Sequence, residues 1–164
     1  MTKLFVFLMK HIKIGSNLLR KVFIKIDKGL ESFSIKLPFI NKRDFILDFR
    51  EPAYLYLLRE GHFDDLTNLQ SLNLIISEND IVFDIGANIG YMSFFFHERC
   101  QKVYAFEPSK RCQYFFNLNL LPTDNIIFEQ TAVGSKKGNL DFYENKVRVN
   151  NGDINMALCD EIQE

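Results

Sequence analysis

Cysteine is scarce in this 164-residue chain, which contains only Cys100, Cys112 and Cys159. An odd number of cysteines without a Cys-x-x-Cys pair offers no disulfide framework. We therefore expect reduced thiols and a cytoplasmic location. The length fits one domain with enough apolar content to bury a core.

Long hydrophobic runs are also absent from the start of the chain. The apolar stretch Leu4–Met9 has six residues and is closed by Lys10. Such a stretch is too short to span a bilayer, and no small-residue cleavage site follows it. A metal motif is incomplete as well, because His97-Glu98 has no second histidine one helical turn later. We expect neither a membrane span at this position nor a metal site.

Positive charge is scarce outside the first thirty residues. Residues 1–30 contain seven basic residues and one acidic residue, a net charge of +6 within a total of −1. The remainder therefore carries −7. Because affinity for nucleic acids rests on basic groups that face phosphates, this acidic body predicts that nucleic acid is not a partner.

The basic segment, residues 1–31, contains an apolar stripe opposite its lysines and arginines. We interpret it as helices at the domain edge with a solvated face. The alternative is peripheral contact with an anionic membrane, which basic amphipathic helices also make. The stripe consists of Leu19, Val22, Phe23, Ile26 and Leu30.

Residues 32–79 predict a hairpin and a helical lead-in. Phe33–Leu37 and Phe45–Phe49 each alternate with period two, which predicts two antiparallel strands. A short helix is expected from Pro52 to Leu58, and a second one after Asp64 or Asp65.

The stretch from Ile81 to Gly90 predicts a strand, a tight turn and a helix. Its first half is a short apolar run of the kind found in buried parallel strands. Gly86 and Asn88 are residue types that tolerate positive φ, and Gly90 permits close packing of the next helix. This arrangement places a binding loop at the carboxyl end of a strand.

The identity of the ligand depends on Asp84. The loop has the pattern Asp84-x-Gly86-x-Asn88-x-Gly90 instead of the Gly-x-Gly-x-x-Gly of pyrophosphate loops. A carboxylate at the loop would repel a pyrophosphate and attract an ammonium or sulfonium group. The pattern therefore favours S-adenosylmethionine, and a nucleotide-dependent dehydrogenase is the less favoured alternative.

A second acidic residue supports a ribose-containing ligand. Val103–Glu107 predicts another strand that ends in an acid, and Glu107 follows Gly86 by 21 positions. This is close to the spacing at which a carboxylate binds ribose hydroxyls.

The rest of residues 80–145 continues an α/β pattern. Ser109 is expected to cap a helix whose inner side contains Tyr114, Phe115 and Leu118. Strands are predicted over Asn125–Phe128 and Leu140–Tyr143. Residues 146–164 form a polar tail.

Three motifs together resemble the FkbM-type S-adenosylmethionine-dependent methyltransferases. They are Val82–Tyr91, Phe106–Pro108 and Thr131–Gly134, within a resemblance over Phe45–Tyr143. The resemblance implies a class I methyltransferase fold and O-methylation of a hydroxyl on a sugar or small molecule. It also implies that Ala132 lines the adenine. The later strands of the family are missing, so we expect a C-terminally truncated half sheet whose first strand is left at an edge.

We therefore expect an α/β, Rossmann-like half sheet that binds S-adenosylmethionine. As given, the chain is expected not to transfer methyl groups, because the C-terminal half is missing. The alternative is a catalytically dead fragment or an interaction module that retains the fold. In either case the isolated chain is expected to be marginally stable, to self-associate or to depend on a partner chain that completes the sheet. No catalytic residue is predicted. The expected cofactor-binding residues are Asp84, Gly86, Asn88, Gly90, Glu107 and Ala132.

Overall fold

The computed structural model describes two short segments and one long one. These are residues 32–36, 44–48 and 66–139, with isolated positions at 7, 8, 11, 18, 21, 22, 25, 51 and 54. The predictions for the basic segment as a whole, Pro52–Leu58, Leu140–Tyr143 and the polar tail lie outside the described residues. Within the described part, no helix is long and apolar enough to cross a membrane.

The largest sheet of the described residues is parallel and has three strands. It contains β3 (Ile81–Ile85), β4 (Lys102–Phe106) and β5 (Ile126–Glu129) in that spatial order. The strands are parallel, and helices α5 (Tyr91–His97) and α6 (Lys110–Leu120) make the two crossovers. The predicted α/β half sheet is confirmed, including its succession of strand, turn and helix.

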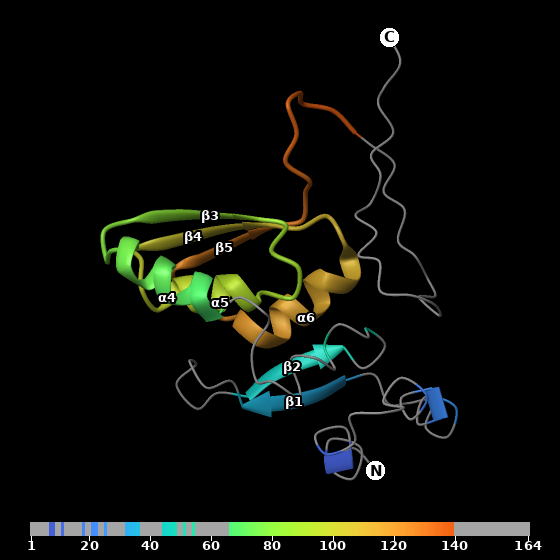
Figure 1. The fold of residues 1–164 in the computed structure, drawn as a ribbon. Coiled ribbons are helices and arrows are strands. Elements are labelled where there is room, and N and C mark those ends of the chain that lie inside the picture. The colour runs from blue at the N-terminus through green and yellow to red at the C-terminus, as the bar shows by residue number, and fades with distance from the viewer. Residues whose placement is uncertain are drawn as a thin grey trace.

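The described elements form three layers (Figure 1). Helices α4 (Leu66–Ile75), α5 and α6 lie on one side of the sheet. Beyond α6 lies an antiparallel hairpin of β1 (Ser32–Lys36) and β2 (Asp44–Asp48), in which Phe33 is opposite Leu47. The predicted hairpin is confirmed, and it covers the helices rather than extending the parallel sheet.

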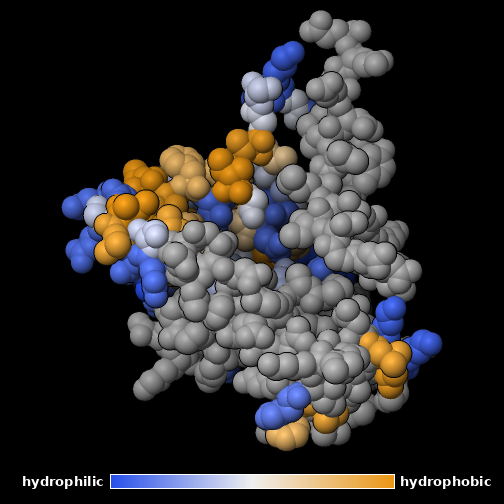
Figure 2. Space-filling model, in the orientation of Figure 1, coloured by the Kyte–Doolittle hydropathy of each residue, from blue (hydrophilic) through white to orange (hydrophobic). Residues whose placement is uncertain are grey.

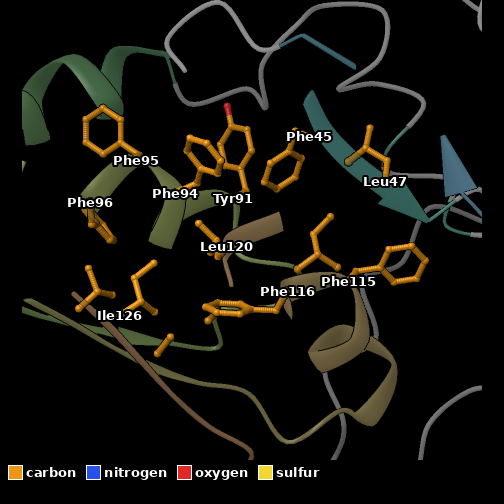
Figure 3. Close-up of a cluster of buried hydrophobic side chains, with 14 of the residues drawn as sticks. Phe45, Leu47, Tyr91, Phe94, Phe95, Phe96, Phe115, Phe116, Leu120 and Ile126 are labelled. Atoms are coloured by element: carbon orange, nitrogen blue, oxygen red, sulfur yellow. The ribbon is translucent and has the colours of Figure 1, made fainter. Parts of the chain in front are cut away.

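Aromatic side chains fill the spaces between these layers (Figure 3). Phe45 of the hairpin meets Tyr91 and Phe94 of α5 edge-on, with ring centroids 6.1 and 5.9 Å apart. On the other side of the helices, Phe116 packs against Phe128 of β5, with ring centroids 4.5 Å apart. Edge-to-face pairs at these distances are favourable beyond the area they bury. The aromatic core therefore joins the hairpin, the helices and the sheet.

The buried face of α6 differs from the predicted one. Phe115 is buried as predicted, but Tyr114 and Leu118 are 54% and 45% exposed, so their predicted inward orientation is wrong. The buried face instead includes Asn119, whose amide nitrogen donates to the carbonyl oxygens of Ile46 and Ile89 at 3.1 and 3.0 Å. Its oxygen accepts the backbone N–H of Ile46 at 2.6 Å. Buried polar groups in folded proteins are almost always hydrogen-bonded, and the partners of Asn119 allow it to share the inward side of α6 with Phe115, Phe116 and Leu120.

The opposite face of the sheet is covered by none of the described helices. Ile81, Phe83 and Ile85 of β3 are 54%, 62% and 63% exposed, and Figure 2 shows hydrophobic surface in this part of the molecule. Phe83 stacks on Tyr104 and Phe106, with centroids 5.4 and 6.2 Å apart. In the described sheet β3 is an edge strand, as expected from the sequence. The result is an apolar sheet face beside an open edge.

Candidate cofactor site

The loop after β3 has the left-handed backbone that its composition predicts. Gly86, Asn88 and Gly90 have φ values of 82°, 51° and 89°. Asparagine is one of the few residues with a side chain that adopts this region readily, because it can form local hydrogen bonds. The loop can therefore reverse within five residues and lead directly into α5.

Most backbone N–H groups of this loop already have acceptors within the protein. Gly86 and Ala87 both donate to the carbonyl oxygen of Phe106, at 2.9 and 3.0 Å. Gly90 donates to the carbonyl oxygen of Ala87 at 2.9 Å, and Asn88 donates to a Glu107 carboxylate oxygen at 3.1 Å. Phosphate loops work differently, because their N–H groups point at the ligand. This loop is therefore poorly suited to a pyrophosphate.

Glu107 lies directly after β4, where its carboxylate joins two segments. Oε2 accepts the N–H of Asn88 at 3.1 Å, and Oε1 accepts the N–H of Ser109 at 3.0 Å. Ser109 also caps α6 as expected, because its hydroxyl accepts the N–H of Cys112 at 3.1 Å. A carboxylate offers about four lone-pair positions, so Glu107 retains capacity for hydroxyl donors. The structure thus holds a preoriented carboxylate beside the loop.

Asp84 is buried on the helix-covered face of β3. Its carboxylate accepts the hydroxyl of Ser93, in the first turn of α5, at 2.5 Å. Burial raises the pKa of Asp84, while hydrogen bonds from the Ser93 hydroxyl and backbone partly offset this effect. Sequence reasoning missed Ser93. The available signal was a single serine in the otherwise apolar run Met92–Phe96.

The two glycines of the loop serve different purposes. A Cβ atom at Gly86 would meet nothing within 4 Å, so the space above this residue is open. A Cβ at Gly90 would come within 2.5 Å of Leu120 Cδ1 and 3.0 Å of Phe116 Cδ2. Gly90 therefore permits close packing of α6 side chains, whereas Gly86 leaves room at the loop for a ligand.

Tyr54 is a second residue that sequence reasoning missed. It is buried, and its hydroxyl donates to Asn88 Oδ1 at 2.8 Å. The thiol of Cys112 contacts the same oxygen at 3.4 Å. Burial raises the pKa of Tyr54 well above its ordinary value, and nearby acidic groups, first the Cys112 thiol and then Glu51, add to the shift. The hydroxyl consequently stays protonated and remains a donor.

Ala132 lies in the exposed segment that follows β5. The carboxyl ends of parallel strands meet at one edge of a sheet, so this segment leaves from the same edge as Gly86 and Glu107. The structure thus brings Gly86, Asn88 and Glu107 together, buries Asp84 behind the loop, and leaves Ala132 in an exposed segment at the same edge.

Among the described residues, no group of three His, Cys, Asp or Glu side chains is placed to hold a metal ion.

Solved structures resemble parts of this chain. An rRNA methylase from Streptococcus thermophilus is 19% identical, with a TM-score of 0.40 over 43% of this chain and 44% of that one. A Streptococcus mutans protein in complex with SAH has the same identity and TM-score, over 43% and 42%. Trm5b from Pyrococcus abyssi is 14% identical, with a TM-score of 0.43 over 71% and 41%. The chain thus spans less than half the length of each of these structures. A scan against protein-family models and a search of curated proteins gave no match.

One prediction from composition is contradicted by these comparisons. Nucleic acid was not expected as a partner, yet the similar structures include an rRNA methylase and the 23S rRNA methyltransferase ErmE. The prediction relied on the net charge outside the first thirty residues. A net charge is a sum over the whole surface, whereas phosphate contacts depend on the local arrangement of basic side chains. Composition therefore does not exclude a nucleic-acid partner.

Proposed function

We propose that the loop 86–90 and Glu107 bind S-adenosylmethionine, and that this chain provides the cofactor-binding half of a methyltransferase. The single observation behind this proposal is the distribution of donors and acceptors. The loop N–H groups of Gly86, Ala87, Asn88 and Gly90 are occupied by protein acceptors, while the Glu107 carboxylate retains lone pairs. A ligand that fits here brings its own donors, such as ribose hydroxyls and an ammonium group.

The open space above Gly86 is consistent with such a ligand, because a Cβ there would meet no protein atom within 4 Å. Asp84 is buried at the end of β3 that leads into the loop, and its carboxylate would favour a cationic methionine portion over a phosphate. Its hydrogen bond to Ser93 also ties the strand to the first turn of α5. In this proposal Asp84 acts behind the loop, and Glu107 contacts the ribose.

S-adenosylmethionine would supply an electrophilic methyl group on a sulfonium. Held by the loop 86–90 and Glu107, it would offer its methyl carbon to an acceptor hydroxyl, whose proton would pass to a base or to water as the carbon–sulfur bond broke. The protein contribution is mainly in-line positioning. From the FkbM-type resemblance, we propose a hydroxyl on a sugar or small molecule as the acceptor.

Ligand titration tests the cofactor assignment directly. We expect S-adenosylmethionine and SAH to bind in isothermal titration calorimetry, and NAD to give no heat of binding. Binding of NAD alone would favour a dehydrogenase, and binding of none of the three would favour an interaction module that only retains the fold. A Gly86→Val variant, with its folding checked by circular dichroism, is the negative control for loop binding.

The acceptor requires a separate assay. In a protein that also contains the second half of the methyltransferase, transfer of a labelled methyl group to a panel of sugar and small-molecule hydroxyls should exceed transfer to rRNA. Greater transfer to rRNA would replace the hydroxyl proposal and leave the cofactor assignment intact.

A further inference from the structure

Asn88 connects the lead-in segment to the carboxylate of Glu107. Its side-chain oxygen accepts the Tyr54 hydroxyl at 2.8 Å, while its backbone N–H donates to Glu107 Oε2 at 3.1 Å. Asn88 also has a left-handed backbone, with φ of 51°. Asparagine tolerates this conformation better than most residues with a side chain. One hydrogen bond holds its side chain and the other holds its backbone.

We propose that Tyr54 is a positioning residue for ribose binding, acting through Asn88 on the carboxylate of Glu107. This role rests on the proposed function. Tyr54 donates to Asn88 from a segment 34 positions earlier in the chain. The orientation of Glu107 toward a ribose is therefore set partly by a residue outside the strand–loop–helix unit. Tyr54 contacts no reacting atom in this proposal and is not a catalytic residue.

The surroundings of Tyr54 suit a permanent donor. The ring is buried, and Tyr54 receives further support from its own backbone, whose N–H donates to the carbonyl oxygen of Glu51 at 3.2 Å. The raised pKa keeps the hydroxyl protonated over the usual experimental range. Ring and hydroxyl have separable effects, since the ring fills the core whereas the hydroxyl reaches Asn88. Tyr54→Phe removes only the second effect.

The test compares two ligands on the full chain. SAH and its 2′,3′-dideoxy analogue are titrated into wild type and Tyr54→Phe. Loss of one neutral hydrogen bond predicts that SAH binding weakens roughly threefold to tenfold. The analogue has no ribose hydroxyls, so its affinity should change by less than about twofold, within the spread of such effects. Tyr104→Phe, which alters a tyrosine of β4 on the uncovered sheet face, is the matched control and should leave both affinities unchanged.

A second variant protects the test against a folding artefact. Asn88→Gly keeps the left-handed backbone accessible and removes the side-chain acceptor. Asn88→Gly should weaken the binding of SAH and leave the affinity for the dideoxy analogue nearly unchanged. Adding Tyr54→Phe to Asn88→Gly should cause no further loss of SAH affinity. Unchanged SAH affinity in Tyr54→Phe, equal losses for both ligands, or additive losses in the double variant would each overturn the role of Tyr54. Absence of SAH binding by wild type would instead overturn the proposed function, together with the role that rests on it.

Discussion

Ser93 donates its hydroxyl to the buried carboxylate of Asp84, across a separation of nine residues. This contact joins the carboxyl end of β3 to the first turn of α5. It encloses the loop 86–90 between two anchored ends. The bond to Ser93 lowers the pKa of Asp84, yet burial dominates and the net shift is upward.

That shift predicts a pH dependence of stability. In the folded protein the pKa of Asp84 lies above its ordinary value of 3.8, so the folded state binds more protons than the unfolded state between the two values. The contribution of this group to the free energy of unfolding therefore falls as pH rises through that window. Asp84→Asn should remove this fall. Urea unfolding of both proteins between about pH 4 and 7 measures it, and parallel pH profiles would contradict the prediction.

Glu107→Ala should weaken both ligand binding and the fold. Charge-assisted hydrogen bonds contribute about 1.5–3 kcal/mol each, so SAH affinity should fall at least about tenfold. The N–H groups of Asn88 and Ser109 would also lose an acceptor, at about 1–3 kcal/mol each if they stay buried. Calorimetry measures the effect on binding, and thermal melting measures the effect on stability. The control is Glu129→Ala, which removes an exposed acid at the end of β5. An unchanged Kd for SAH in folded Glu107→Ala would show that Glu107 is not part of the site.

Gly86→Ala separates backbone strain from ligand contact. The positive φ of 82° should reduce stability by about 1–2 kcal/mol, but the new Cβ would touch no protein atom. A loss of SAH affinity of about tenfold or more in the folded variant would then report a ligand close to this position. Gly138→Ala places a Cβ in equally open space without a positive φ and should change neither quantity. Full affinity in Gly86→Ala would show that the ligand lies elsewhere.

The apolar sheet face predicts association. Phe83 lies on a face that none of the described helices covers, beside the open edge of β3. An exposed edge strand presents unpaired backbone N–H and C=O groups, which can pair with another chain. Light scattering should show a mass that increases with concentration, and Phe83→Lys should reduce that increase without changing SAH affinity. The control is Tyr114→Lys, which changes an exposed aromatic residue of α6 and should leave association unchanged. If it reduces association as much as Phe83→Lys does, the effect reflects general solubility and not the sheet face.

The sequence predicts the local parts of this fold well. The strand Ile81–Ile85, the left-handed loop and the Ser109 cap all depend on residues within a few positions of one another. Glycine and asparagine identify the positive φ positions directly, because few other residues tolerate them. The parallel arrangement of β3, β4 and β5 also follows from strands that alternate with helices.

The contacts that the sequence did not reveal are non-local. The hydroxyls of Ser93 and Tyr54 find their partners 9 and 34 positions away, and Asn119 finds Ile46 at a separation of 73. A polar residue beside apolar ones has the same local pattern whether it faces solvent or a buried carbonyl. For this reason the local pattern correctly predicts Phe115 on the inner side of α6 but wrongly adds Tyr114 and Leu118, and it does not indicate that Asn119 is buried.

The hydrogen bonds of Asn119 have a consequence for the order of folding. This side chain joins the hairpin to α6 and, through the carbonyl oxygen of Ile89, to the loop 86–90. The strand–helix–strand unit makes its contacts over short sequence distances, whereas docking of the hairpin closes a much longer stretch of chain. Longer closures cost more conformational entropy and are reached later. The loop should therefore acquire its final hydrogen bonds in the last stage of folding, when the first part of the chain docks onto the second.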